Sequence, residues 1–251
     1  MANPDCPNNP TFIIDPPATV FLQYDFSAGA VLVDSSSNDD TLLQEVKTFT
    51  IVTVPVGQIN NPLNTAAVIP STSTFALIAR SRLTFPTTLS VEFVFALPAL
   101  TSSNQDLFAF SGSISSTVIG SIVSVNSGGA LLLSVVTAKN TATYTFNSLT
   151  LAAGRLNHVV VTSSGTQVIF YLNGNAMTES PVATNLAGNN YFEIARKANM
   201  IADEVFVYSS TLSASVVEAR YNSLGLFLSS MKSGLRDFFQ LDLLFVFFFV
   251  F

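Results

Sequence analysis

The 251-residue chain contains no tryptophan, one cysteine and one histidine, and only 10% of its residues are charged. The single cysteine, Cys6, excludes an intrachain disulfide and a cysteine-based zinc site. Low charge combined with 49% hydrophobic residues argues against a disordered chain. The few Lys and Arg residues are scattered and the formal net charge is -6, so we expect no nucleic-acid partner.

Two further absences concern the cellular route. The N-terminal stretch MANPDCPNNP has neither a positive region nor an apolar region, so it is not a secretory signal. No Asn-x-Ser/Thr acceptor is available, because the one near match, Asn9-Pro10-Thr11, is blocked by its proline. These absences predict a location at a virion or other assembly surface rather than classical secretion.

Short runs of β-branched and aromatic residues, separated by Gly, Asn, Pro and Ser, fill the chain up to Leu212. This pattern is typical of an all-β protein, and about a dozen strands in one domain predict a two-sheet sandwich. Residues 56–74, rich in Pro, Asn and Thr, are expected to form a long surface loop. The expected strands are Val20–Phe26, Phe49–Val54, Phe75–Ala79, Leu89–Ala96, Leu107–Phe110, Ile119–Val125, Ala130–Val136, Thr141–Phe146, Asn157–Ser163, Gln167–Leu172, Tyr191–Ile194 and Glu204–Tyr208.

The C-terminal part departs from this pattern. Residues 213–222, SASVVEARYN, predict one short helix, in which Ser215 and Glu218 have the spacing of a capping box and Gly225 ends the helix. From residue 226 the composition changes abruptly, and the chain finishes in LLFVFFFVF. We therefore divide the chain into an N-terminal arm (1–19), a sandwich (20–225) and a hydrophobic tail (226–251).

Three motifs occur in an order that points to a family. HVVVTSSGTQVIFYLNG, from residue 158, predicts a hairpin followed by a second tight turn. Together with YDFSAGAVLVDSSSNDD (24–40) and IADEVFVYSSTLSASVVEARYN (201–222), it resembles the LamG-like jelly roll of the concanavalin A-like lectin/glucanase superfamily. The resemblance implies an antiparallel jelly-roll sandwich with about six or seven strands in each sheet. It implies little about activity, because that superfamily includes lectins, adhesion modules, glycosidases and structural proteins.

The catalytic candidates are weak. His158 lies at the start of a strand with no H-x-H or H-E-x-x-H pattern nearby, so we interpret it as a packing and hydrogen-bonding residue. A glycosidase needs two carboxylates held across the sugar. Glu92 and Glu193 each lack an acidic neighbour on their strand, and Asp203 and Glu204 are adjacent, so they point to opposite faces within a strand. The sequence therefore predicts a protein that is not an enzyme.

Two kinds of ligand site remain open. The loop DSSSNDD concentrates oxygen ligands of the type that calcium prefers. Some relatives with similar loops hold a structural calcium with help from the closing strand, and this resemblance makes Asp34, Asn38, Asp40 and Asp203 the candidates. The alternative is that Asp34 and Asn38 form Asx turns without a metal. Aromatic and amide side chains that could contact a glycan are Tyr144, Tyr171, Tyr191, Asn189 and Asn190.

The tail suggests an interaction with another surface. Residues 238–251 are shorter than the roughly 20 apolar residues that span a bilayer, and Asp242 interrupts them. We expect this segment to dock on a neighbouring subunit or on its own sandwich in preference to a membrane, because exposed phenylalanines are unfavourable in water. The expected contacts are Phe238, Phe239, Phe245, Phe247, Phe248 and Phe249.

The sequence thus predicts a non-enzymatic interaction module, a structural or decorating component of a larger assembly such as a virus capsid. The alternative is a lectin-like or adhesion domain that binds a glycan or a protein surface.

Overall fold

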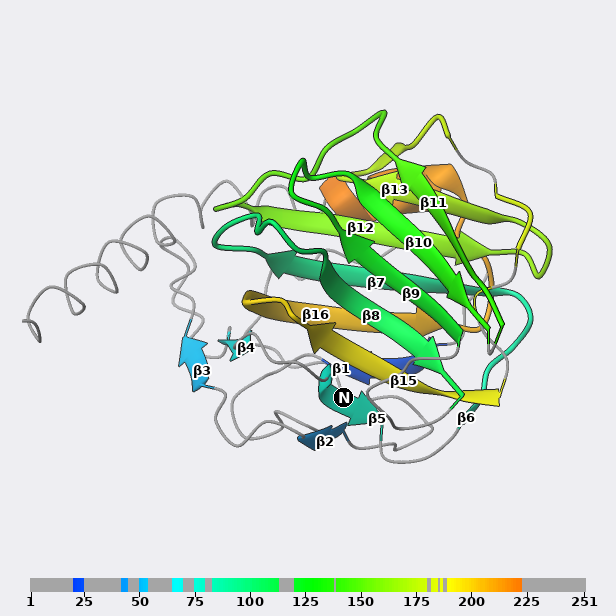
Figure 1. Ribbon diagram of the computed structural model, residues 1–251. Coiled ribbons are helices and arrows are strands. Elements are labelled where there is room, and N and C mark those ends of the chain that lie inside the picture. Colours follow the sequence, from blue (N-terminus) through cyan, green and yellow to red (C-terminus); the bar gives the residue numbers. More distant parts are fainter. Residues whose placement is uncertain are drawn as a thin grey trace, which may run out of the picture.

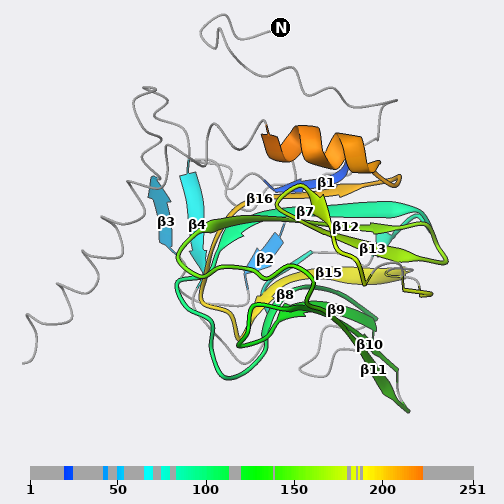
Figure 2. The ribbon, with the colours of Figure 1, turned by 90° about the horizontal axis from the view of Figure 1, so that it is seen from above.

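The computed structural model describes residues 20–24, 42–44, 50–53, 65–69, 75–79, 83–112, 120–137, 139–179, 182–184, 186 and 189–222. Within them the chain forms two antiparallel sheets that pack face to face, with one helix on the outside (Figures 1 and 2). All twelve strands expected from the sequence are present, which confirms the all-β jelly-roll prediction.

The first sheet, sheet A, has the strand order β14-β13-β12-β7-β16-β4-β3, and β1 pairs with β16 beside β4. Its strand β16 therefore has two partners on one side, β4 along its first half and β1 along its second half. The bounds of its strands are β1 Val20–Tyr24, β3 Thr50–Thr53, β4 Thr65–Ile69, β7 Leu89–Ala96, β12 Leu156–Ser163, β13 Val168–Leu172, β14 Asn175–Ala176 and β16 Met200–Tyr208.

The second sheet, sheet B, has the order β11-β10-β9-β8-β15-β5-β2, and β6 pairs with the start of β15. All of its pairings are antiparallel. The bounds of its strands are β2 Leu42–Gln44, β5 Phe75–Ala79, β6 Leu83–Thr84, β8 Gln105–Ser111, β9 Gly120–Val125, β10 Leu131–Val136, β11 Thr141–Phe146 and β15 Asn189–Arg196.

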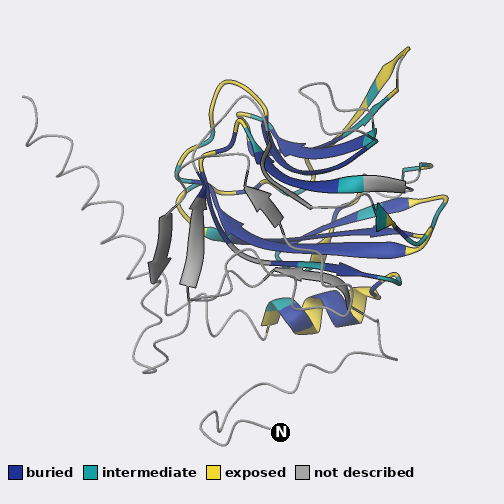
Figure 3. Cartoon of the chain, turned by 90° about the horizontal axis from the view of Figure 1, so that it is seen from below, coloured by how far each residue is buried: buried dark blue, intermediate teal, exposed yellow. Residues whose placement is uncertain are grey.

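The core lies between the two sheets, because alternate residues of each strand face the opposite sheet. On β7 the inward residues are Leu89, Val91, Phe93 and Phe95, and all four are fully buried. Phe108, Phe110 and Phe192 meet from sheet B, with ring centroids 5.3 to 6.2 Å apart. Figure 3 shows this buried double layer, with exposed residues gathered at the loops and at the projecting end of β10 and β11.

Two short turns of sheet A follow the sequence prediction. Gly165 has a φ of 90° in the turn between β12 and β13, where the Ser164 N–H donates to the Gln167 carbonyl at 3.0 Å. Asn173 and Gly174 have φ values of 51° and 81°, which is the left-handed pair of a tight hairpin turn before β14.

Two expectations about local structure were wrong. The predicted loop 56–74 contains β4, which pairs with both β3 and β16. The expected helix is confirmed over residues 214–222, but Ser213 rather than Ser215 caps it, because the Ser213 hydroxyl accepts the Val216 N–H at 3.4 Å. The predicted helix end at Gly225, the arm and the tail lie outside the described residues.

Candidate functional site

The lone histidine lies under the helix on the outer face of sheet A. His158 belongs to β12 and is fully buried. Its backbone N–H donates to the Asn173 Oδ1 at 2.9 Å, and its backbone carbonyl accepts the Asn173 N–H at 2.8 Å. The backbone of residue 158 thus fixes the turn that follows β13.

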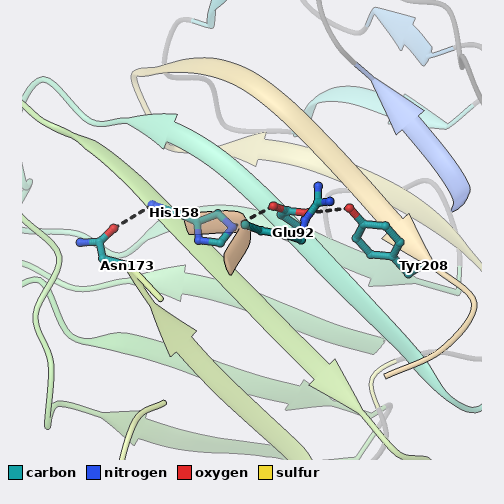
Figure 4. A network of polar contacts seen from close by, with 5 residues as sticks. Glu92, His158, Asn173 and Tyr208 are labelled. Atoms are coloured by element: carbon teal, nitrogen blue, oxygen red, sulfur yellow. Dashed lines mark hydrogen bonds and ion pairs between the residues drawn. The ribbon is translucent and has the colours of Figure 1, made fainter. Parts of the chain in front are cut away.

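The side chain of His158 contacts the carboxylate of Glu92, for which the sequence pattern gave no partner. Its Nε2 lies 2.9 Å from the Glu92 Oε1, and a carboxylate only accepts, so Nε2 carries the proton (Figure 4). The other oxygen, Oε2, accepts the Tyr208 hydroxyl and the Arg220 Nε, each at 2.6 Å. We call these four residues, Glu92, His158, Tyr208 and Arg220, the Glu92 cluster.

The cluster keeps Glu92 ionised although its side chain is buried. Burial alone would raise the pKa of this carboxyl. The hydrogen bond from His158, the charge of Arg220 and the bond from Tyr208 outweigh that effect, and they lower the pKa from 4.5 to about 2. Glu92 is therefore an anion at neutral pH with both oxygens hydrogen-bonded.

The helix 214–222 supplies the cation of the cluster and covers it. The Arg220 guanidinium carbon lies 5.3 Å from the Phe206 ring centroid and 5.4 Å from that of Tyr208. On the next residue, the Tyr221 ring stacks against His158 with centroids 6.0 Å apart. A Cβ at Gly174 would come within 2.9 Å of the Tyr221 ring, so a residue without a side chain is needed there.

Apolar contacts fix the helix on the same sheet. Val216, Val217 and Leu212 pack with outward residues of β12, β13 and β16, among them Val160 and Tyr171. Just before the helix, the Ser90 hydroxyl accepts the Leu212 N–H at 2.8 Å and donates to the Ser210 carbonyl at 2.9 Å. The Glu92 cluster is therefore an ionic bond between sheet and helix within an apolar contact.

The Glu92 cluster does not have the geometry of an active site. Glu92 is 1% exposed and the helix closes the face above it, so no substrate reaches the carboxylate. A general acid at neutral pH also needs a raised pKa, whereas that of Glu92 is lowered. The chemistry of these residues is structural cross-linking.

A second ion pair lies on the outer face of sheet B. The Arg196 Nε on β15 lies 2.6 Å from the Asp106 Oδ2 on β8. Burial raises the pKa of Asp106, and the charge and hydrogen bond of Arg196 oppose the rise without cancelling it. Glu193, which precedes Arg196 on β15, lies on the same face and pairs with Ala109 of β8.

The rest of that outer face carries a row of hydroxyl side chains beside an apolar cluster of Ala109, Ile122, Val136 and Tyr191. The register of sheet B places Ser124, Ser134 and the three threonines of β11 on this face, with Tyr191 at its far side. On this face Asp106, Ala109 and Glu193 are buried, Ser134 and Tyr191 are half-buried, and the threonines Thr141, Thr143 and Thr145 are exposed. We call this surface the hydroxyl face.

The tyrosines proposed from the sequence as glycan contacts do not come together. Tyr171 is buried beneath the helix on sheet A. Tyr191 lies on the hydroxyl face, whereas Tyr144 points to the inner side at the edge of sheet B, opposite Leu133. For Asn189 and Asn190 the structure gives the backbone alone, which pairs with β6.

The candidate calcium and tail residues fall mostly outside the described chain. Asp34, Asn38, Asp40 and the six phenylalanines of the tail are not among the described residues. The backbone of Asp203 lies in β16 between Ala202 and Glu204, where the register with β7 shifts. Among the described side chains, no group of three His, Cys, Asp or Glu could hold a metal, and no helix is long and apolar enough to cross a membrane.

Comparison with known proteins agrees with the fold. The family model Laminin_G_3, of the concanavalin A-like lectin/glucanases superfamily, matches residues 70–218. A search of curated proteins gave no match. Since the match to this family covers more than half of the chain, the protein belongs to this superfamily of jelly-roll domains.

Solved structures with the same fold include binding domains of botulinum neurotoxins. The serotype G binding domain is 12% identical with a TM-score of 0.59, and the match covers 81% of this chain and 51% of that one. A serotype DC binding domain in complex with rat synaptotagmin II is 11% identical, with a TM-score of 0.55 and coverages of 82% and 52%. A structure of botulinum neurotoxin type C, described with the dependence of its cell entry on two ganglioside molecules, is 12% identical with a TM-score of 0.60 and coverages of 82% and 51%. The chain spans about half the length of these domains.

Proposed function

We propose that the domain is a non-enzymatic binding module that recognises a glycan through the hydroxyl face of sheet B. The observation that carries this proposal is the row of Ser and Thr side chains on that face, which becomes more exposed from β9 to β11. Hydroxyl groups donate and accept hydrogen bonds, so they match the hydroxyls of a sugar. The type C toxin structure of similar fold, which is described with two ganglioside molecules, supports a binding role.

The acid and base residues support the absence of catalysis. Glu92 and His158 are used in the contact between sheet and helix. On sheet B, Asp106 is paired with Arg196. A glycosidase would need a carboxyl pair free to approach the sugar from both sides.

A glycan array, followed by titration of the best glycan, tests this proposal. Ser134→Tyr places a large side chain in the middle of the hydroxyl face and should weaken binding at least about tenfold, which corresponds to about 1.4 kcal/mol. Ser164→Tyr makes the same change in the β12–β13 turn of the other sheet and should leave the affinity unchanged. Absence of binding to every glycan, or equal losses in both variants, would contradict a glycan site on this face.

A protein ligand is the alternative, supported by the similar toxin domain that is described with synaptotagmin II. The wider hypothesis of a component of a capsid or similar assembly stays a prediction from the sequence, because the tail on which it depends lies outside the described residues. The proposed calcium at Asp34, Asn38, Asp40 and Asp203 also stays a prediction, because the first three of these residues lie outside the described residues.

A further inference from the structure

Among the described strands, β11 ends sheet B with one edge that no other strand pairs with. Four strands end the two sheet orders in the described chain, and β11 is the longest at six residues, against two for β14, four for β3 and three for β2. It pairs with β10 over six consecutive residue pairs without a register shift. Its sequence TATYTF has no charge and no proline, so it lacks the features that usually protect an edge from pairing.

The hydrogen-bonding groups of this edge can be assigned from the hairpin. The Thr137 N–H donates to the Asn140 carbonyl at 2.8 Å, and hydrogen-bonded pairs alternate with non-bonded pairs along an antiparallel ladder. Ala142, Tyr144 and Phe146 therefore bond to β10. The N–H and C=O groups of Thr141, Thr143 and Thr145 point away from β10, where no described strand pairs with them.

We propose that β11 pairs antiparallel with β11 of a second copy of this chain, with Thr143 on the twofold axis. In this register Thr143 lies opposite its own copy, and Thr141 lies opposite Thr145. All the outward N–H and C=O groups of the three threonines are then bonded, and Thr–Thr pairs stabilise adjacent strands. The contact is isologous, so it closes as a dimer and joins the two B sheets. This inference goes beyond the proposed glycan function and does not depend on it.

The side chains of the edge fit a second copy. Tyr144 is 37% exposed and is the one exposed large hydrophobic residue among the described side chains. In the proposed register it lies opposite Ala142 of the second copy, whose small side chain leaves room for the ring.

The charges at the two ends of β11 are also complementary. Lys139 precedes the strand, and the Glu179 carboxylate at the other end accepts the Asn147 N–H at 2.9 Å. Antiparallel pairing places Lys139 of one copy opposite Asn147 of the other, beside that carboxylate. Opposite charges therefore meet at both ends of the contact, and no charged residue lies between them.

Sedimentation of the full chain tests the dimer. Thr143→Pro removes the outward N–H and leaves the bonds to β10 in place, because proline is tolerated on the free side of an edge strand. Thr143→Ala is the matched control, since it removes the hydroxyl that bonds Ser134 but keeps the N–H. We expect the proline variant to have half the mass of the wild type and the alanine variant to keep the wild-type mass. A monomeric wild type, or equal masses for the two variants, would overturn the proposal.

Cross-linking tests the register. In a Cys6→Ser background, Thr143→Cys places two thiols at a pair whose Cα atoms are about 5.5 Å apart, within the range of a disulfide. Thr145→Cys places each thiol opposite Thr141 of the second copy, so its two thiols are too far apart. Mild oxidation should give a covalent dimer for the first variant alone. Equal cross-linking of both variants, or of neither, would rule out this pairing.

Discussion

At the scale of single residues, Glu92 connects the sheet to the helix. Its carboxylate joins β7 to His158 on β12, to Tyr208 on β16 and to Arg220 on the helix. Removing one member of a buried ionic group leaves another buried charge without its partner. The resulting loss of folding stability is larger than the loss caused by replacing the whole group with apolar residues.

We predict that Glu92→Gln lowers the free energy of unfolding by about 3 kcal/mol at neutral pH, the value expected when a carboxyl pKa near 4.5 is lowered to about 2. Because the folded-state pKa is lowered, this stabilisation is complete above about pH 4.5 and is lost as the pH falls towards 2. Urea unfolding at several pH values should therefore show the wild type and the variant converging in acid. Glu218→Gln, on the exposed side of the helix, is the control and should change little. A constant difference at all pH values would argue against an ionised Glu92.

The role of His158 could be predicted from its place at the start of a strand with no H-x-H or H-E-x-x-H pattern nearby, but the partners of Glu92 could not. Glu92 and His158 are 66 residues apart, and Glu92 and Arg220 are 128 apart. Local periodicity assigns residues to a face of a strand and does not say which strands are neighbours. A signal was nevertheless present, since a glutamate within SVEFVFAL is expensive to bury unless a cation lies nearby.

At the scale of elements, every strand longer than five residues was predictable, and the four strands that were missed are short. Strands β5, β7 and β11 have the bounds expected from their β-branched and aromatic runs. The four missed strands, β2, β4, β6 and β14, have two to five residues and exist through pairing with longer neighbours. Such strands depend on tertiary context more than on local propensity.

The start of the helix gives a prediction at the same scale. Ser213→Ala should lower the free energy of unfolding by about 1 kcal/mol, because its hydroxyl caps the Val216 N–H. Ser215→Ala lies inside the first turn and should cost clearly less, although the sequence pattern favoured it as the cap. Thermal unfolding of the two variants decides between these positions, and a larger loss for Ser215→Ala would restore the capping box at residue 215.

At the scale of the whole molecule, the described core and its covering helix are complete by residue 222. The main core cluster runs from Ile69 to Val207, and the family match ends at residue 218. The division at 225 predicts that the Phe-rich residues beyond Gly225 are not needed to complete the sandwich.

A chain ending after Gly225 should consequently fold, with a melting temperature within about 2 °C of the full chain. A chain ending after Ser210 is the contrasting variant, because it loses the helix, uncovers Val160 and Tyr171, and leaves Glu92 without Arg220. We expect it to be unfolded or strongly destabilised in circular dichroism.

The sedimentation mass of the first truncation separates two roles of the tail. If the tail joins subunits, the mass falls to that of the β11 dimer, whereas an unchanged mass with a lower melting temperature means that the tail packs on its own sandwich.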